Sequence, residues 1–218
     1  MTPSRLVFVT GGTGYMGRRV IPALLARGHR VRALVREGSQ WKLPPGSEAV
    51  VGNALDEETF ASRIAPADTF LQLIGVAHPS PAKASEFRAV DLASAKASAR
   101  AAAAAGVAHF VYVSVAQPAP VMKAYVEARA EGEAAVRTAG LKATIVRPWY
   151  VLGPGHRWPY LVLPVYRLLQ LFPPTREAAR RLYPVTLKQM IATLVAAVED
   201  PAVGVRIVET PQIRQART

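Results

Sequence analysis

The chain has 218 residues, of which 50% are hydrophobic and 19% charged, a composition that fits one sizeable folded domain and excludes a disordered protein. It contains no cysteine, which excludes disulfides, thiolate metal sites and cysteine nucleophiles. Lys and Arg outnumber Asp and Glu by 27 to 15, but the excess is spread over both halves of the chain, so nucleic acid is not expected as the main ligand, whereas phosphorylated ligands are favoured.

Short apolar runs alternate with helical patterns along the first two thirds of the chain. Residues 5–10, RLVFVT, predict a buried strand, and a helical pattern follows as far as Gly28, with Pro22 in an early turn. Further strands are predicted at 29–37, 48–56, 68–77, 107–115 and 142–148, and helices at 57–65, 86–106 and 122–140. Six strands that alternate with helices predict an α/β protein with a Rossmann-type, doubly wound parallel sheet.

The character of the sequence changes after Pro148. The next 36 residues are rich in proline and aromatic residues, and they are followed by a predicted helix at 187–200 and a short strand at 204–209. We therefore predict a main domain at 1–148 and a small C-terminal cap at 149–218, packed on that domain rather than folded independently.

Three glycines lie between the first strand and the first helix. Gly11, Gly14 and Gly17 have the spacing G-x-x-G-x-x-G. Gly11 permits a sharp turn out of the strand, Gly14 leaves room for a pyrophosphate beside the backbone, and Gly17 lets the helix pack closely on the strand. The unpaired N–H groups at the start of the helix supply partial positive charge for phosphates, so this loop predicts a dinucleotide site.

The second strand indicates which dinucleotide is used. An acidic residue at its end would bond the ribose 2′-hydroxyl and favour NAD. Instead the strand carries Arg36, after Arg32, and the nearby acid, Glu37, comes one position later. Because a guanidinium suits a 2′-phosphate through a bidentate contact, we predict NADP bound through Arg36, with NAD as the alternative.

The motifs TGGTGYMG, VRALVR, GNALD, HFVYVSV and TIVRPWYVLGPG together resemble the atypical short-chain dehydrogenase/reductase superfamily over residues 4–155. They are similar in particular to NmrA-like and NAD(P)H-binding proteins related to nucleotide-sugar epimerases and to the accessory respiratory complex I subunit of this fold. The resemblance implies cofactor contacts at Gly11, Thr13, Gly14, Tyr15, Met16, Asn53, Ala54, Leu73, Ile74 and Gly75. Asn53 stands where many relatives have an aspartate, and its carbonyl can still accept a bond from the adenine amine.

Catalytic members of the superfamily use a tyrosine and a lysine four residues later on one helix face, with a serine or threonine at the end of the fifth strand. By this resemblance Tyr125 takes the tyrosine position, and Arg129 stands in place of the lysine. Arginine keeps the positive charge, but its planar guanidinium differs from an ammonium and does not titrate. Ser114 is the serine candidate, although the usual register places the catalytic oxygen at Val115.

Two functions are compatible with these residues. The first is an NAD(P)-dependent oxidoreductase or epimerase acting on a small apolar substrate, with Tyr125 as proton donor and Arg129 as its charge partner and ribose contact. The alternative is a non-catalytic NADP(H)-sensing, assembly or regulatory protein of the NmrA-like type. The retained tyrosine favours the first, whereas Arg129 and Val115 favour the second. The N-terminal residues do not form a signal peptide, so we expect a cytoplasmic protein.

The histidines do not suggest a metal. His29, His78, His109 and His156 are isolated, without the spacing of metal ligands, so no metal site is predicted. His78 differs from the others because its loop follows the fourth strand, at the carboxyl edge where such sheets bind ligands. This loop and the proline-containing loop at 115–120 are candidate pocket walls, with a structural role as the alternative.

Residues 158–174, WPYLVLPVYRLLQLFPP, form a strongly apolar stretch. It is short and contains Pro164, Arg167 and Gln170, so it is a poor transmembrane helix. Three interpretations remain: a lid over the pocket that favours a hydrophobic substrate, a dimer or partner surface, and a segment lying on a membrane surface among nearby arginines. Packing with a contribution to the pocket is favoured, and membrane contact is the lesser alternative.

Overall fold

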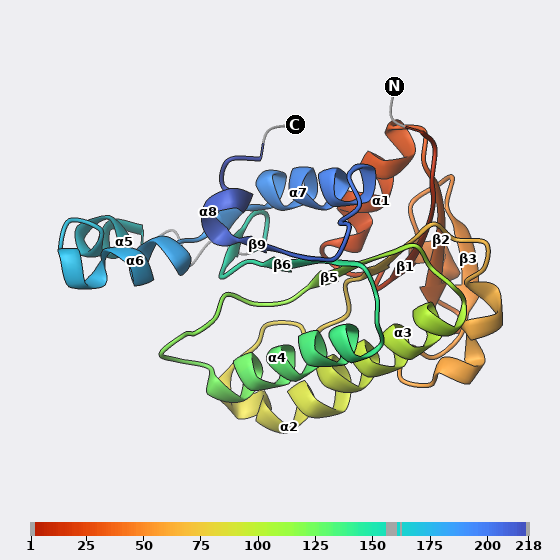
Figure 1. Ribbon diagram of the computed structural model, residues 1–218, viewed down its shortest axis with the longest axis horizontal. Helices are drawn as coiled ribbons and strands as arrows, with labels where there is room; N and C mark the ends of the chain where they lie inside the picture. Colours follow the sequence, from red (N-terminus) through yellow and green to blue (C-terminus); the bar gives the residue numbers. More distant parts are fainter. Residues whose placement is uncertain (1–2, 156–160, 162, 217–218) are drawn as a thin grey trace.

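The computed structural model describes residues 3–155, 161 and 163–216 (Figure 1). Its centre is a seven-stranded sheet in the order β3-β2-β1-β4-β5-β6-β9, and every neighbouring pair in it is parallel. The strands are β1 (Leu6–Thr10), β2 (Arg30–Val35), β3 (Glu48–Val51), β4 (Thr69–Gln72), β5 (His109–Val113), β6 (Ala143–Arg147) and β9 (Val205–Glu209). This arrangement confirms the predicted Rossmann-type α/β fold.

Helices cover both faces of the sheet (Figure 1). On one face lie α1 (Gly17–Ala26) and α7 (Leu187–Glu199), and on the other α3 (Ala93–Ala104) and α4 (Lys123–Thr138). The shorter helices are α2 (Ala84–Glu86), α5 (Leu163–Leu169), α6 (Pro173–Arg181) and α8 (Thr210–Ile213). A two-stranded parallel ladder joins β7 (Val151–Leu152) to β8 (Val185–Thr186).

The strands are apolar on both sides because each side packs against helices. In β1, Phe8 points to the side of Phe60, Phe70 and Phe110, where the rings of Phe70 and Phe110 stack with centroids 5.1 Å apart. Val7 and Val9 point to the opposite side, which is filled from α1 and α7 by residues that include Ile21, Leu24, Leu194 and Val198. The alternation of side chains along a strand thus supplies two cores from one apolar run.

Two predicted helices differ from the observed structure. The helix predicted at 57–65 is replaced by two 3₁₀ turns, Glu57–Thr59 and Ala61–Arg63. Phe60 between them has an extended φ of −141°, which interrupts the helix and directs its fully buried ring into the core. The helix predicted at 86–106 begins instead with a π-helical segment, Phe87–Leu92, ahead of α3.

The segment after residue 148 contributes to the main layers of the fold. The strand predicted at 204–209 is β9, which pairs with β6 and extends the sheet, and the helix predicted at 187–200 is α7, which packs beside α1. Helices α5 and α6 project from this body (Figure 1). The predicted apolar stretch 158–174 is described at residues 161 and 163–174; Trp158 and His156 lie outside the described residues.

His109 at the start of β5 makes a pH-dependent contribution to stability. The side chain is fully buried, with Nε2 3.0 Å from Thr144 Oγ1. Burial, aided by the charges of Arg206 and Arg5, lowers its pKa from 6.5 to about 4. The unfolded chain therefore binds a proton that the folded chain excludes in this pH range, and stability falls as the pH drops from 6.5 towards 4.

We expect the free energy of unfolding to fall by up to about 3 kcal/mol over that interval through His109 alone. Urea denaturation at several pH values between 7 and 4, compared with His109→Gln, isolates this contribution, because the variant has no titrating group at the position. Equal pH slopes in the two proteins would contradict it.

Candidate functional site

A cleft of about 940 Å³ opens at the carboxyl edge of the sheet. It is lined by the loops that follow β1, β2, β3 and β4 and by the segment that follows β6. Of the residues predicted to contact a cofactor, those lining the cleft are Gly11, Thr13, Gly14, Tyr15, Met16, Arg36, Asn53, Ala54, Leu73, Ile74 and Gly75. Segments far apart in the sequence therefore meet at one edge, as parallel strands require.

The glycine loop forms the floor of this cleft. Gly11 has a positive φ of 75°, and a Cβ there would lie 3.0 Å from the carbonyl carbon of Leu73. Gly17 is buried away from the cleft, where a Cβ would collide with the carbonyl oxygen of Gly11. Gly14 is exposed at the cleft, and its N–H donates to Gly11 O over 3.0 Å. The missing side chains allow α1 to start directly against β1.

The N-terminus of α1 lies beside the cleft and provides an anion site. Met16 precedes the helix without a side-chain capping bond, and there is no acidic residue in the first turn. The partial positive charge of the helix start is therefore available to a phosphate. Together with the glycine floor and the length of the cleft across four loops, this fits a dinucleotide, whose pyrophosphate would lie over Gly14.

Arg32 in β2 and Arg36 directly after it have different roles. Arg36 is exposed at the cleft. Arg32 lies away from it, with Nη1 donating to Arg63 O over 2.8 Å and Nε 3.0 Å from Glu48 Oε1. The sequence prediction missed Arg18 and Ser39, which also line the cleft. Arg18 could have been found from its place in the first turn of the helix that starts at the predicted dinucleotide site.

Asn53 is already engaged by its own loop. Its Oδ1 accepts a hydrogen bond from Leu55 N–H over 3.1 Å, and its own N–H donates to Thr59 Oγ1 over 2.9 Å. A carbonyl oxygen has two lone pairs, so Oδ1 retains acceptor capacity towards the cleft.

The predicted catalytic tyrosine lies outside the cleft. Tyr125 lines a separate cavity of about 140 Å³ with residues that include Pro81, Phe87 and Met122. Its ring packs against Phe87 with centroids 4.9 Å apart. Val76 lines the main cleft, and it also packs against the apolar cluster of Phe87, Leu92 and Ala128 that Tyr125 joins.

Arg129 is turned into the protein and forms a buried ion pair. Its Nη2 lies 2.6 Å from Asp91 Oδ1, and Nη1 donates to Val113 O over 2.8 Å. Burial alone would lower the pKa of Arg129, but Tyr125, Tyr112 and Asp91 raise it overall, so the guanidinium stays charged. Burial raises the pKa of Asp91, and Arg129 opposes that rise.

This ion pair holds the loop that follows β4. Asp91 Oδ2 accepts the N–H of Val76 over 3.0 Å, and a Cβ at Gly75 would collide with the guanidinium of Arg129. Asp91 is itself fully buried. Arg129 and Asp91 therefore support the cleft wall at Gly75 and Val76 from behind.

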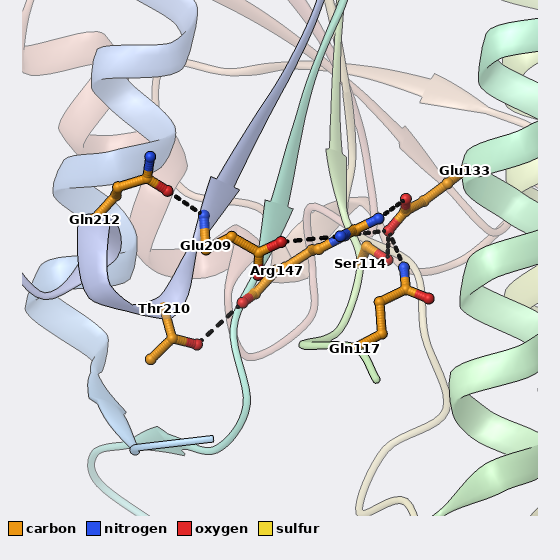
Figure 2. Close-up of polar contacts among 7 residues, drawn as sticks. All are labelled: Ser114, Gln117, Glu133, Arg147, Glu209, Thr210 and Gln212. Atoms are coloured by element: carbon orange, nitrogen blue, oxygen red, sulfur yellow. Dashed lines mark hydrogen bonds and ion pairs between the residues drawn. The ribbon is translucent and has the colours of Figure 1, made fainter. Parts of the chain in front are cut away.

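Ser114 is also engaged, in the network drawn in Figure 2. Its hydroxyl donates to Glu133 Oε1 over 2.6 Å, and this buried carboxylate also accepts from Gln117 Nε2 and from Arg147 Nε and Nη2. Arg147 Nη1 donates in turn to Glu209 Oε1 over 2.9 Å. The network joins α4 to the ends of β5, β6 and β9, and Ser114 lines neither of the two cavities.

The far end of the cleft was only partly predicted. Val76, Ala77, His78 and Pro79 from the loop after β4 line it, as proposed for the loop around His78, whereas the loop at 115–120 is absent from the lining. Trp149 and Tyr150 were missed. They directly follow β6 at the carboxyl edge, which is the signal that could have found them.

A glycine turn at a helix start, on the first strand of a parallel sheet with this strand order, defines a Rossmann dinucleotide-binding protein. Residues 11–157 match the family described as NAD(P)H-binding. The chain belongs to this family and binds a nicotinamide cofactor.

Two curated relatives illustrate the similarity. Ceramide reductase from Caulobacter vibrioides is 31% identical over 214 residues, which cover 96% of this chain and 65% of that protein. A 3-beta-hydroxysteroid dehydrogenase from Mycolicibacterium neoaurum is 32% identical over 114 residues, which cover 50% of this chain and 31% of that protein. The chain thus spans less than two thirds of the length of either relative.

Solved structures share the fold. The Bordetella bronchiseptica enzyme WbmH in complex with NAD+ has a TM-score of 0.70 and 21% identity, over 93% of this chain and 75% of that one. The Thermus thermophilus UDP-glucose 4-epimerase complex with NAD has a TM-score of 0.67 and 18% identity, over 96% of this chain and 81% of that one.

Breaking the buried ion pair should be costly. Arg129→Met leaves the Asp91 carboxylate buried without its cation and should lower the free energy of unfolding by about 3–5 kcal/mol. Arg129→Met combined with Asp91→Leu should recover most of that loss, because it removes both charges. Chemical denaturation measures both variants.

The matched control is Arg88→Met, which breaks the exposed ion pair with Glu131 on the same two helical segments. It should change stability little, because surface pairs contribute little. Equal losses for Arg88→Met and Arg129→Met would contradict the role assigned to the buried pair.

Proposed function

We propose that this protein is an NADP(H)-dependent oxidoreductase that interconverts a carbonyl and a hydroxyl group on an apolar substrate. The observation that carries the proposal is the shape of the main cleft, in which a phosphate cradle and exposed arginines at one end are continuous with an apolar wall at the other. When bound, the nicotinamide supplies or accepts the hydride, and the protein has to orient the substrate and handle the accompanying proton.

The preference for NADP rests on the positive charge at the adenosine end. Arg36 and Arg18 are both exposed at the cleft, and Ser39, whose N–H donates to Arg36 O over 3.0 Å, also lines it. Two guanidinium groups and a hydroxyl can each donate to a 2′-phosphate, whereas a ribose with a free 2′-hydroxyl would not use this charge. Glu37, the nearby acid, does not line the cleft.

An apolar substrate is supported by the opposite end of the cleft and by the relatives. Its wall there contains Val76, Ala77, Pro79, Val90 and Trp149, which would exclude water from the reacting groups. The names of relatives refer to ceramide, to a farnesyl-substituted quinoline oxide and to a steroid. These are apolar molecules, and we extend that substrate class to this chain.

For the proton we propose Tyr125, on the basis of the family resemblance. Val76, in the loop after β4, lines the cleft and also packs against the apolar cluster that Tyr125 joins, and a movement of this loop would open the cleft towards the phenol. Tyr150, like Tyr15, already lines the cleft, and burial, with Tyr166 as the second cause, raises the pKa of Tyr150. A phenol that stays protonated at neutral pH can donate to a developing alkoxide, so Tyr150 is tested alongside Tyr125.

Reversing the charge of Arg36 should change the cofactor preference. Arg36→Asp should weaken NADPH binding by about tenfold or more through loss of a charge-assisted contact, and it should leave NADH binding unchanged or tighter. Fluorescence titration with both cofactors gives the ratio. Arg30→Asp is the matched control, since Arg30 is exposed at the other end of β2 and does not line the cleft. An unchanged ratio in Arg36→Asp would refute the NADP assignment.

Turnover should require the glycine loop that holds the cofactor and the phenol of Tyr125. NADPH oxidation is followed with a panel of long-chain and steroidal ketones, and Gly14→Val, which fills the space above Gly11 O, should abolish it. Tyr125→Phe should reduce kcat by about 10²-fold or more, the usual loss on removing a general acid, and Tyr150→Phe should leave kcat largely unchanged.

A loss of kcat in Tyr150→Phe, with little change in Tyr125→Phe, would assign the proton donor to Tyr150. Full activity in both Phe variants would show that neither Tyr125 nor Tyr150 supplies the proton. NADPH binding without turnover on any carbonyl would support the alternative, a non-catalytic NADP(H)-sensing or regulatory protein.

A further inference from the structure

Helices α5 and α6 project from the body (Figure 1), and large apolar side chains on and beside them are exposed. We call residues 161 and 163–181 the lobe. Its exposed large apolar residues are Leu161, Val165, Leu168, Leu169, Leu171 and Phe172. Leu161 is 81% exposed, and Leu171 and Phe172, in the turn between the helices, are 69% and 54% exposed. Contiguous exposed apolar residues of this size mark an interaction surface.

The same lobe is basic. Arg167, Arg176 and Arg180 are exposed, and Glu177 is its one acidic residue. Arg176 and Arg180 are one helical turn apart on α6 and therefore project on the same side. Apolar residues and cations thus occur together on a short, protruding element. These apolar side chains are exposed and do not pack over the cleft as a lid.

The charge indicates what covers this surface. A second copy of the chain placed on the lobe would bring these arginines against the same arginines of its partner, in a protein with a net charge of +12. An anionic lipid surface instead satisfies both features, because its phosphates attract arginine and its acyl boundary takes up leucine and phenylalanine. Among the helices that the structure describes, none is long and apolar enough to cross a bilayer.

We propose that the lobe docks this protein on the surface of an anionic phospholipid bilayer. Leu171 and Phe172 enter the boundary between headgroups and acyl chains, and Arg167 and Arg180 contact the lipid phosphates.

The lobe is connected to the apolar end of the cleft. Trp149 lines the cleft, and its Nε1 donates to the hydroxyl of Tyr166 on α5 over 3.1 Å. The Tyr166 ring also packs edge-on against Tyr183 with centroids 5.9 Å apart, which fixes α5 on the body. Docking would therefore bring the apolar end of the cleft near a membrane, which is a source of apolar substrates. This consequence rests on the proposed function, whereas the docking itself does not.

The docking is tested by sedimentation with vesicles, in the absence of cofactor and substrate. The full chain should bind vesicles of phosphatidylcholine with phosphatidylglycerol, and binding should weaken with added salt and with phosphatidylcholine alone. Leu171→Ser with Phe172→Ser should reduce the partition coefficient by about tenfold or more, as should Arg167→Glu with Arg180→Glu. Trp41→Ser is the control, since Trp41 is 80% exposed but lies outside the lobe.

Three results would overturn the proposal: no binding of the wild type to anionic vesicles, equal binding to neutral ones, or undiminished binding of both lobe variants. Light scattering without vesicles tests the competing occupant, because a dimer that the Leu171→Ser and Phe172→Ser changes dissociate would assign the lobe to a second copy. Because no cofactor is present, these outcomes are independent of whether the protein turns over a carbonyl substrate.

Discussion

The fold depends on the close approach of α1 to the end of β1. A Cβ at Gly17 would collide with the carbonyl oxygen of Gly11, and a Cβ at Gly11 would press on the backbone of Leu73. Only with no side chain at either position can the helix start at the strand end, with its positive N-terminal end at the cleft and the loop after β4 beside it. The phosphate site is therefore a consequence of backbone packing. The two apolar cores between the sheet and its helices hold this loop in place.

A second interaction fixes the wall opposite that floor. The buried pair of Arg129 and Asp91 connects α4 with the π-helical segment before α3, and it bonds the N–H of Val76 from behind the cleft. In a site of low polarity a guanidinium needs a carboxylate at this distance, which is why Arg129 turns inward. The same reasoning applies to Ser114, whose hydroxyl serves the Glu133 carboxylate shared with Arg147 (Figure 2). Both Arg129 and Ser114 are therefore held by buried carboxylates in this chain.

The fold and the cofactor end of the site were predictable because they depend on local patterns. Apolar runs of strand length, helical spacing and three glycines between them are read along the chain, and the strand order then places Leu73 to Gly75 beside Gly11. The exceptions affect short segments, but their cause is not local. Phe60 interrupts a helical pattern because its ring is required in the core, and that requirement depends on Phe8 and Phe70, which are distant in sequence.

The sequence by itself determined a parallel sheet with a dinucleotide loop, since both follow from residue spacing. Only the tertiary structure decided which side chains face the cleft: Arg36 does and Arg32 does not, Tyr150 does and Tyr125 does not. It also decided that residues after 148 complete the sheet through β9, and that the apolar residues of α5 and α6 face outward. The physical reason is that the direction of a side chain depends on partners such as Asp91, Glu133 and Glu48, whose contacts are set by the fold and not by their distance along the chain.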